Sequence, residues 1–160
     1  MKGFHYKYHR TMRTIKFRGK DVFTDTWKYG DLVHNQKVTT TGLEPRTMVG
    51  GYEVDPSTVG QYTGFLDKNG KEIYEGDVLL KAGGVRYDII NTPYEVYGII
   101  GFEDYTARFV INDFYLTING NKGTGNACGH SFTQDYMQGF EVVGPVHDKE
   151  WQEKLKLNNE

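Results

Sequence analysis

The chain has 160 residues, of which 38% are hydrophobic and 14% aromatic, with 20 glycines and a formal net charge of −2. This composition argues against a helical bundle, and no apolar run approaches the ~18 residues of a membrane span. The single cysteine, Cys128, cannot form an internal disulfide. We therefore expect a soluble, β-rich protein of the cytoplasm, without a signal peptide and without a membrane partner.

The first 20 residues are strongly basic, whereas the rest of the chain is acidic. Residues 1–20 carry seven lysines and arginines and no acid, so the other 140 residues have 12 basic and 21 acidic groups, a net charge of −9. We expect residues 1–12 to form a basic, aromatic arm, which is typical of a solvated terminus but can also bind phosphates or an acidic neighbouring subunit. The candidate nucleic-acid contacts are Lys2, Lys7, Arg10, Arg13, Lys16 and Arg18, with arm tyrosines stacking on bases.

Residues 13–58 are expected to form a small N-terminal β segment. The predicted strands cover residues 14–18, 27–33 and 48–54. A turn is expected at 19–21 and a bend at Gly30. The polar stretch 34–46 predicts an exposed loop. A turn at 55–58, which begins Asp-Pro, is the predicted boundary to the next part of the chain.

Residues 59–147 are expected to form the main β-barrel domain. The predicted strands cover residues 61–66, 71–74, 78–80, 85–90, 96–102, 107–111, 114–118 and 140–146. Strands that recur at this spacing, separated by Gly, Asn and Asp, are typical of a barrel or a sandwich. The glycine-rich stretch 119–126 predicts a mobile loop.

The last residues, 148–160, are expected to form a short helix that docks on the barrel. Asp148 suits the N-cap, and Trp151 and Leu155 have the i, i+4 spacing of one helical face. Glu150 and Lys154 have the spacing of an ion pair. A helix this short is marginal alone, so we expect Trp151 to pack on the sheet.

The central block of the sequence resembles the YopX family, small proteins of bacteriophages and other mobile elements. The block consists of VGQYTG at 59–64 and DKNGKEIYEGDV at 67–78; IKFR at 15–18, YGDL at 29–32 and EVVG at 141–144 fit in order. The resemblance implies an SH3-like β-barrel, oligomer formation and a role in a phage or transposon genome. It implies no known enzyme activity and supplies no catalytic residue.

Candidate reactive groups are few. Cys128 and His130 supply two metal ligands, whereas zinc needs four, or three with a water. The same two residues as a nucleophile and base would also need an oxyanion hole. Glu75 and Asp77 flank a glycine, where capping of a turn explains them. We therefore predict no metal, no cofactor and no catalytic residue, with a Cys128/His130 hydrolase or metal protein as a third alternative.

Tyrosines are more numerous than the core of a small barrel easily holds. The candidate partner contacts are Tyr87, Tyr94, Tyr97 and Tyr105, with cross-strand packing as the competing interpretation. We expect a non-enzymatic binding or assembly module that joins copies of itself, or a protein partner, through tyrosines and strand edges. The alternative is a nucleic-acid-binding module that uses the basic arm. No small-molecule substrate is evident.

Overall fold

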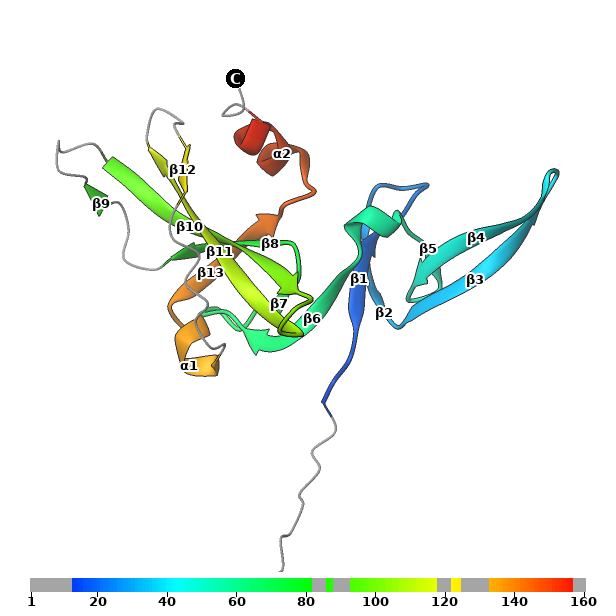
Figure 1. Cartoon of the computed structure of the whole chain (residues 1–160), viewed down its shortest axis with the longest axis horizontal. Coiled ribbons are helices and arrows are strands. Elements are labelled where there is room, and N and C mark those ends of the chain that lie inside the picture. The colour runs from blue at the N-terminus through cyan, green and yellow to red at the C-terminus, as the bar shows by residue number, and fades with distance from the viewer. Residues whose placement is uncertain (1–12, 82–85, 88–92, 118–121, 125–132, 157–160) are drawn as a thin grey trace, which may run out of the picture.

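The computed structural model describes residues 13–81, 86–87, 93–117, 122–124 and 133–156. Within these ranges most residues lie in antiparallel strands of three sheets, and two short helices lie at the C-terminal side (Figure 1). The predicted all-β class is confirmed. No helix in the described ranges is long and apolar enough to cross a membrane.

A four-stranded sheet joins the N-terminal part of the chain to the rest. Its order is β2 (Trp27–Gly30), β1 (Phe17–Lys20), β6 (Gly60–Leu66) and β7 (Glu72–Tyr74). In the ladder between β1 and β6, Phe17 pairs with Gln61. The predicted boundary lies in the chain between β1 and β6, where the structure has a short 3-10 helix, Pro56–Thr58. The ladder between β1 and β6 therefore joins the two parts of the chain on either side of this boundary.

A six-stranded sheet curls around the main core (Figure 1). Its path is β12 (Lys122–Thr124), β11 (Arg108–Thr117), β10 (Pro93–Glu103), β8 (Asp77–Lys81) and β13 (Phe140–Pro145), with β9 (Arg86–Tyr87) paired to β10. Buried side chains from this sheet, from β7 and from the first helix form one cluster: Ile73, Leu79, Ile100, Ile111, Met137, Phe140 and Val142. The apolar stretches of the sequence thus line the inside of the curled sheet.

The third sheet is a long hairpin that projects away from the curled sheet (Figure 1). It contains β3 (Leu32–Thr39), β4 (Gly42–Val49) and the short β5 (Tyr52–Glu53). We call β3 and β4 the ribbon. The prediction of an exposed loop over 34–46 is therefore wrong. Both faces of the ribbon are exposed towards its tip, so its strands there lack the alternation of apolar and polar residues by which a half-buried strand is recognised.

Two short helices cover parts of the curled sheet. The first, α1 (Gln134–Met137), was not predicted; it begins at Thr133, whose side chain accepts a hydrogen bond from the amide of Tyr136. The second, α2 (Lys149–Lys156), was predicted, and Trp151 is buried against Val78 and Tyr97. Its expected ion pair forms, with Lys154 Nζ and Glu150 Oε1 2.6 Å apart.

Several predicted boundaries are corrected by tertiary contacts. Strand β1 continues through Gly19 instead of turning there, because Gly19 pairs with Lys28 of β2. The two strands predicted over 107–111 and 114–118 are one strand, β11. Lys122–Thr124, predicted as part of a loop, pairs with β11 as β12. Each change follows from pairing with a neighbouring strand.

Candidate functional site

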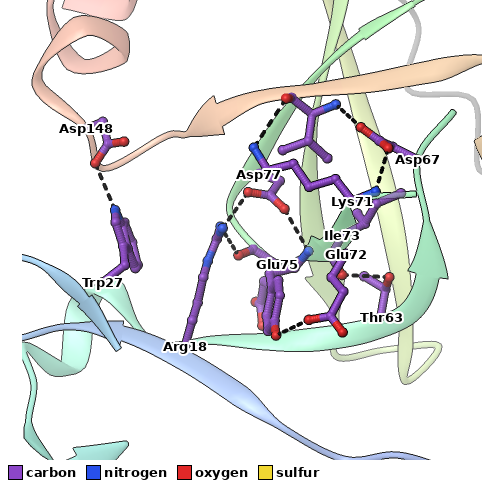
Figure 2. A network of polar contacts seen from close by, with 12 residues as sticks. Arg18, Trp27, Thr63, Asp67, Lys71, Glu72, Ile73, Glu75, Asp77 and Asp148 are labelled. Atoms are coloured by element: carbon purple, nitrogen blue, oxygen red, sulfur yellow. Dashed lines mark hydrogen bonds and ion pairs between the residues drawn. The ribbon is translucent and has the colours of Figure 1, made fainter. Parts of the chain in front are cut away.

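Arg18 is the centre of a buried polar network between the four-stranded and the curled sheet (Figure 2). Its side chain is 4% exposed, because two aromatic rings and the turn between β7 and β8 surround it. The guanidinium lies between two rings, 4.8 Å from the Trp27 centroid and 5.2 Å from the Tyr74 centroid. Its Nη1 donates to Asp77 Oδ1 at 2.5 Å, and its Nη2 donates to the carbonyl oxygen of Glu75 at 3.0 Å.

Asp77, at the start of β8, is fully buried and has both carboxylate oxygens occupied. Oδ1 accepts from Arg18, and Oδ2 accepts from the backbone amide of Tyr74 at 2.7 Å. Burial raises the pKa of Asp77, while the charge of Arg18 and the Tyr74 amide act against this rise. The pair therefore holds β1 against the turn between β7 and β8.

Asp67 forms a second buried link in the same region (Figure 2). Its Oδ1 accepts from the amides of Asn69 and Lys71, both at 2.8 Å, so it shapes the turn between β6 and β7. Its Oδ2 accepts from the amide of Val142 at 2.9 Å, which joins this turn to β13. The carboxylates of Asp67 and Asp77 are thus occupied by groups of the chain itself, and we interpret both as structural.

A side-chain bond also connects helix α2 to the N-terminal sheet. The Trp27 Nε1 donates to Asp148 Oδ1 at 3.0 Å (Figure 2). The backbone carbonyl of Asp148 accepts from the amide of Gln152, so the same residue begins the helix. Trp27 therefore contacts both Arg18 and the segment before α2.

A small pocket opens beside this network. Its volume is about 300 Å³, and it is lined by Phe17, Val59, Gln61, Glu75, Phe102 and Asp104. These residues come from β1, from β6 and the residue before it, from the turn between β7 and β8, and from the end of the β10–β11 hairpin. Burial, together with the nearby charge of Asp104, raises the pKa of Glu75. The pocket thus combines two carboxylates with two aromatic rings.

The three predicted nucleic-acid residues that the structure describes do not share one surface. Lys2, Lys7 and Arg10 lie outside the described residues. Arg13 is exposed, with its Cζ 6.0 Å from the ring centroid of Phe109. Lys16 forms an ion pair with Glu72 and lies over the Tyr62 ring. Arg18 is buried, as described above.

The four candidate tyrosines are also in different environments. Tyr105 is 97% exposed at the end of the β10–β11 hairpin. Tyr97 is buried, its ring 5.4 Å from that of Trp151, and its hydroxyl donates to Glu95 at 2.6 Å. The backbones of Tyr87 and Tyr94 belong to β9 and β10, where they pair with Pro93 and Arg86 respectively. The side chains of Tyr87 and Tyr94 lie outside the described part of the structure; of the other two, Tyr105 has the exposure that a partner contact needs.

The Cys128/His130 hypothesis falls outside the described residues. Within the described ranges, no group of three His, Cys, Asp or Glu side chains is arranged to hold a metal ion.

The ribbon carries a second candidate functional surface. Cross-strand partners place Leu32, His34, Gln36, Val38, Leu43, Pro45, Thr47 and Val49 on one face. This set contains no acidic residue, lysine or arginine, and we call it the uncharged face. At its tip Val38 pairs with Leu43, and these side chains are 85% and 64% exposed. The opposite face is charged, with Lys37 bonded to Glu53.

Sequence reasoning missed the pocket and misjudged Arg18. Glu75 lies in the turn between β7 and β8, as predicted, but the 28 residues between Glu75 and Asp104 hide the proximity of these two residues. Arg18 was grouped with the basic arm by its charge. The signal that could have placed it in the core is its position in a strand, beside Phe17, within the stretch 15–18 that resembles the family.

We predict that His147 contributes to a loss of stability under mild acid. Burial and the charges of Arg18 and Lys20 lower its pKa, outweighing Asp55 and Asp148. A histidine whose folded-state pKa lies below its unfolded value of about 6.5 binds more protons when unfolded, so stability falls as pH falls through that value. In urea unfolding, His147→Gln should lose less stability than the wild type between pH 7 and pH 5. An identical pH dependence would contradict this prediction.

The comparison with known protein families agrees with the sequence resemblance. The sequence model of the family described as YopX protein matches residues 16–150. No curated protein matches the chain. Among solved structures, protein EF1440 from Enterococcus faecalis is 19% identical; the match covers 86% of this chain and 96% of that one, with a TM-score of 0.49.

Proposed function

The chain belongs to the YopX family, and on this premise we propose that it is a non-enzymatic module that assembles with further copies of itself through the ribbon. The setting we propose is the cytoplasm of a bacterial host that carries a phage or another mobile element. The family resemblance supports this setting, and a single cysteine suits a reducing compartment.

The uncharged face of the ribbon is the observation that carries the proposal. An isolated two-stranded ribbon is marginally stable in water, and exposed apolar side chains on it favour a covering partner. Val38 and Leu43 are exposed in the single chain. Two copies of this face can meet around a twofold axis without opposing like charges, because the face carries no lysine, arginine or acidic residue. A second copy is therefore the partner that this surface fits.

A non-enzymatic role is supported by how the buried ionisable groups are used. Asp67 and Asp77 each have both carboxylate oxygens bonded within the chain. Arg18 is bonded to Asp77 and to a carbonyl oxygen. Groups held in this way stabilise the fold and are not presented to a substrate.

We predict that Val38→Lys/Leu43→Lys converts the assembly to monomers. Burying the uncharged face would then require burying charge, which is costly without a paired group. Sedimentation velocity at micromolar concentration should show a multimer for the wild type and the mass of one chain for the double variant. The matched control, Val33→Lys/Asn35→Lys, adds the same charge to the opposite face of β3 and should remain multimeric. A monomeric wild type, or equal dissociation of the control, would contradict the proposal.

The nucleic-acid role of the basic arm stays a prediction. Two of the six candidate nucleic-acid contacts, Lys16 and Arg18, form ion pairs with Glu72 and Asp77 respectively. That engagement removes two cations from those available for phosphates, and it favours assembly as the main proposal.

A further inference from the structure

The pocket beside the Arg18 network has the composition of a site for an organic cation. Its walls include the rings of Phe17 and Phe102, and its polar side chains are Gln61, Glu75 and Asp104. A volume of about 300 Å³ is at the lower end of ligand pockets, which span roughly 300–1,000 Å³. It therefore suits one side chain or a similarly small group.

The two carboxylates of the pocket are not neutralised by the part of the chain that the structure describes. No described lysine or arginine forms an ion pair with Glu75 or Asp104, whereas Glu103, next along the chain, pairs with Arg108. The nearest buried cation, Arg18, gives its Nη1 to Asp77 and reaches Glu75 only at its backbone carbonyl. A cation that entered the pocket would offset the burial and the nearby charge of Asp104, which together raise the pKa of Glu75.

The aromatic walls decide which cation fits. A guanidinium is planar and weakly hydrated, and it stacks on aromatic rings while it bonds to carboxylates. A calcium ion instead takes six to eight oxygen ligands, and rings supply none. The Phe102 ring is 43% exposed and is held by an edge contact with Phe109, at 5.4 Å between centroids. It is thus a fixed and accessible surface for a planar cation.

We propose that this pocket binds the guanidinium group of an arginine side chain presented by a partner protein, with Glu75 and Asp104 as its anionic ligands and Phe17 and Phe102 as its walls. The proposal goes beyond the proposed assembly and does not depend on it, because it names the chemical group that a protein bound at this second surface would contribute. Gln61, on β6, supplies a side-chain amide at the same opening.

The test is a titration of the full-length chain with N-acetyl-arginine amide, followed by NMR. The backbone amides of Gln61, Glu75 and Phe102 should shift and saturate, with a dissociation constant on the order of 1 mM, as suits a single side chain. N-acetyl-citrulline amide has nearly the same shape without the charge, and it should bind at least about tenfold more weakly, a difference of about 1.4 kcal/mol.

Variants assign the binding to the pocket. Glu75→Gln/Asp104→Asn should weaken arginine binding at least about tenfold. The control, Asp31→Asn/Glu153→Gln, changes the net charge equally at two exposed sites away from the pocket and should bind as the wild type does. Unchanged urea midpoints show that each variant is folded.

The inference is overturned by shifts that do not saturate, by equal binding of the citrulline compound, or by wild-type binding of the pocket variant. The result is distinguishable from that for assembly. A multimer that does not bind arginine amide overturns the pocket alone, whereas a monomer that binds it overturns the assembly alone.

Discussion

Replacing Arg18 with methionine is expected to lower the free energy of unfolding by about 3–5 kcal/mol, because it leaves the buried Asp77 carboxylate without its cation. Asp77 is fully buried, and its Oδ1 lies 2.5 Å from Arg18 Nη1. The substitution also removes the donor to the Glu75 carbonyl oxygen. Urea unfolding at neutral pH measures the loss.

A double variant separates the cost of an unpaired charge from the cost of lost packing. Arg18→Met/Asp77→Asn removes both charges but keeps an oxygen that can accept from the Tyr74 amide. It should be more stable than Arg18→Met alone. The control, Lys154→Met, breaks an exposed pair with Glu150 and should cost less than about 1 kcal/mol. A loss of under about 1 kcal/mol for Arg18→Met would show that the pair is not structural.

The pH dependence of the Arg18→Met variant gives a second readout. Burial raises the pKa of Asp77, and removing Arg18 takes away the charge that opposes this rise. An acid whose folded-state pKa is above its unfolded value binds more protons when folded, so its contribution to stability grows as pH falls. The difference in the free energy of unfolding between the wild type and the variant should therefore shrink as the pH falls towards the pKa of Asp77.

Replacing Asp67 with alanine is expected to cost about 3 kcal/mol or more. The carboxylate accepts from three backbone amides, those of Asn69, Lys71 and Val142. A buried donor left without an acceptor costs about 1–3 kcal/mol. Asp67 is 1% exposed, so water does not readily take the place of its carboxylate as the hydrogen-bond acceptor. Urea unfolding measures the total loss, and amide exchange at Val142 reports the link to β13.

Asparagine at the same position should cost less than alanine. Asp67→Asn keeps an oxygen for the two amides of the turn but places an NH₂ group opposite the Val142 amide. Its cost should therefore be about that of one unsatisfied donor, 1–3 kcal/mol. The control is Asp55→Ala, which removes an exposed cap on the amide of Ser57 and should cost about 1 kcal/mol. Equal losses for alanine and asparagine would show that the link to β13, and not the acceptor for the turn, accounts for the cost.

Local chemistry explains where prediction succeeded. The turns at 67–70 and 75–77 contain Gly70 and Gly76 at φ of +79° and +77°, a region that glycine adopts without strain. The apolar run after Asp77 is strand β8, and the i, i+4 pattern around Trp151 is helix α2. Each of these features depends on residues within a few positions of one another, so the sequence displays it directly.

The wrong predictions concern elements that depend on strand pairing or on packing in the folded chain. The ribbon was predicted as a loop because its outer strands bury neither face, and only the pairing of Val38 with Leu43 and its neighbours makes them strands. Helix α1 has four residues, too few for a periodic pattern, and forms where Met137 enters the core. Strand β12 exists through its partner β11.

For this chain, the residues alone determined the all-β class, the order of most strands, the glycine turns and the terminal helix, because these follow from short-range periodicity and backbone freedom. The tertiary structure alone decided that Arg18 is a buried partner of Asp77 and not a surface cation, and that Glu75 and Asp104 line one pocket. The charge of a residue and its place in a sequence pattern can be read from the sequence. Its burial and its neighbours from other strands depend on how the sheets pack.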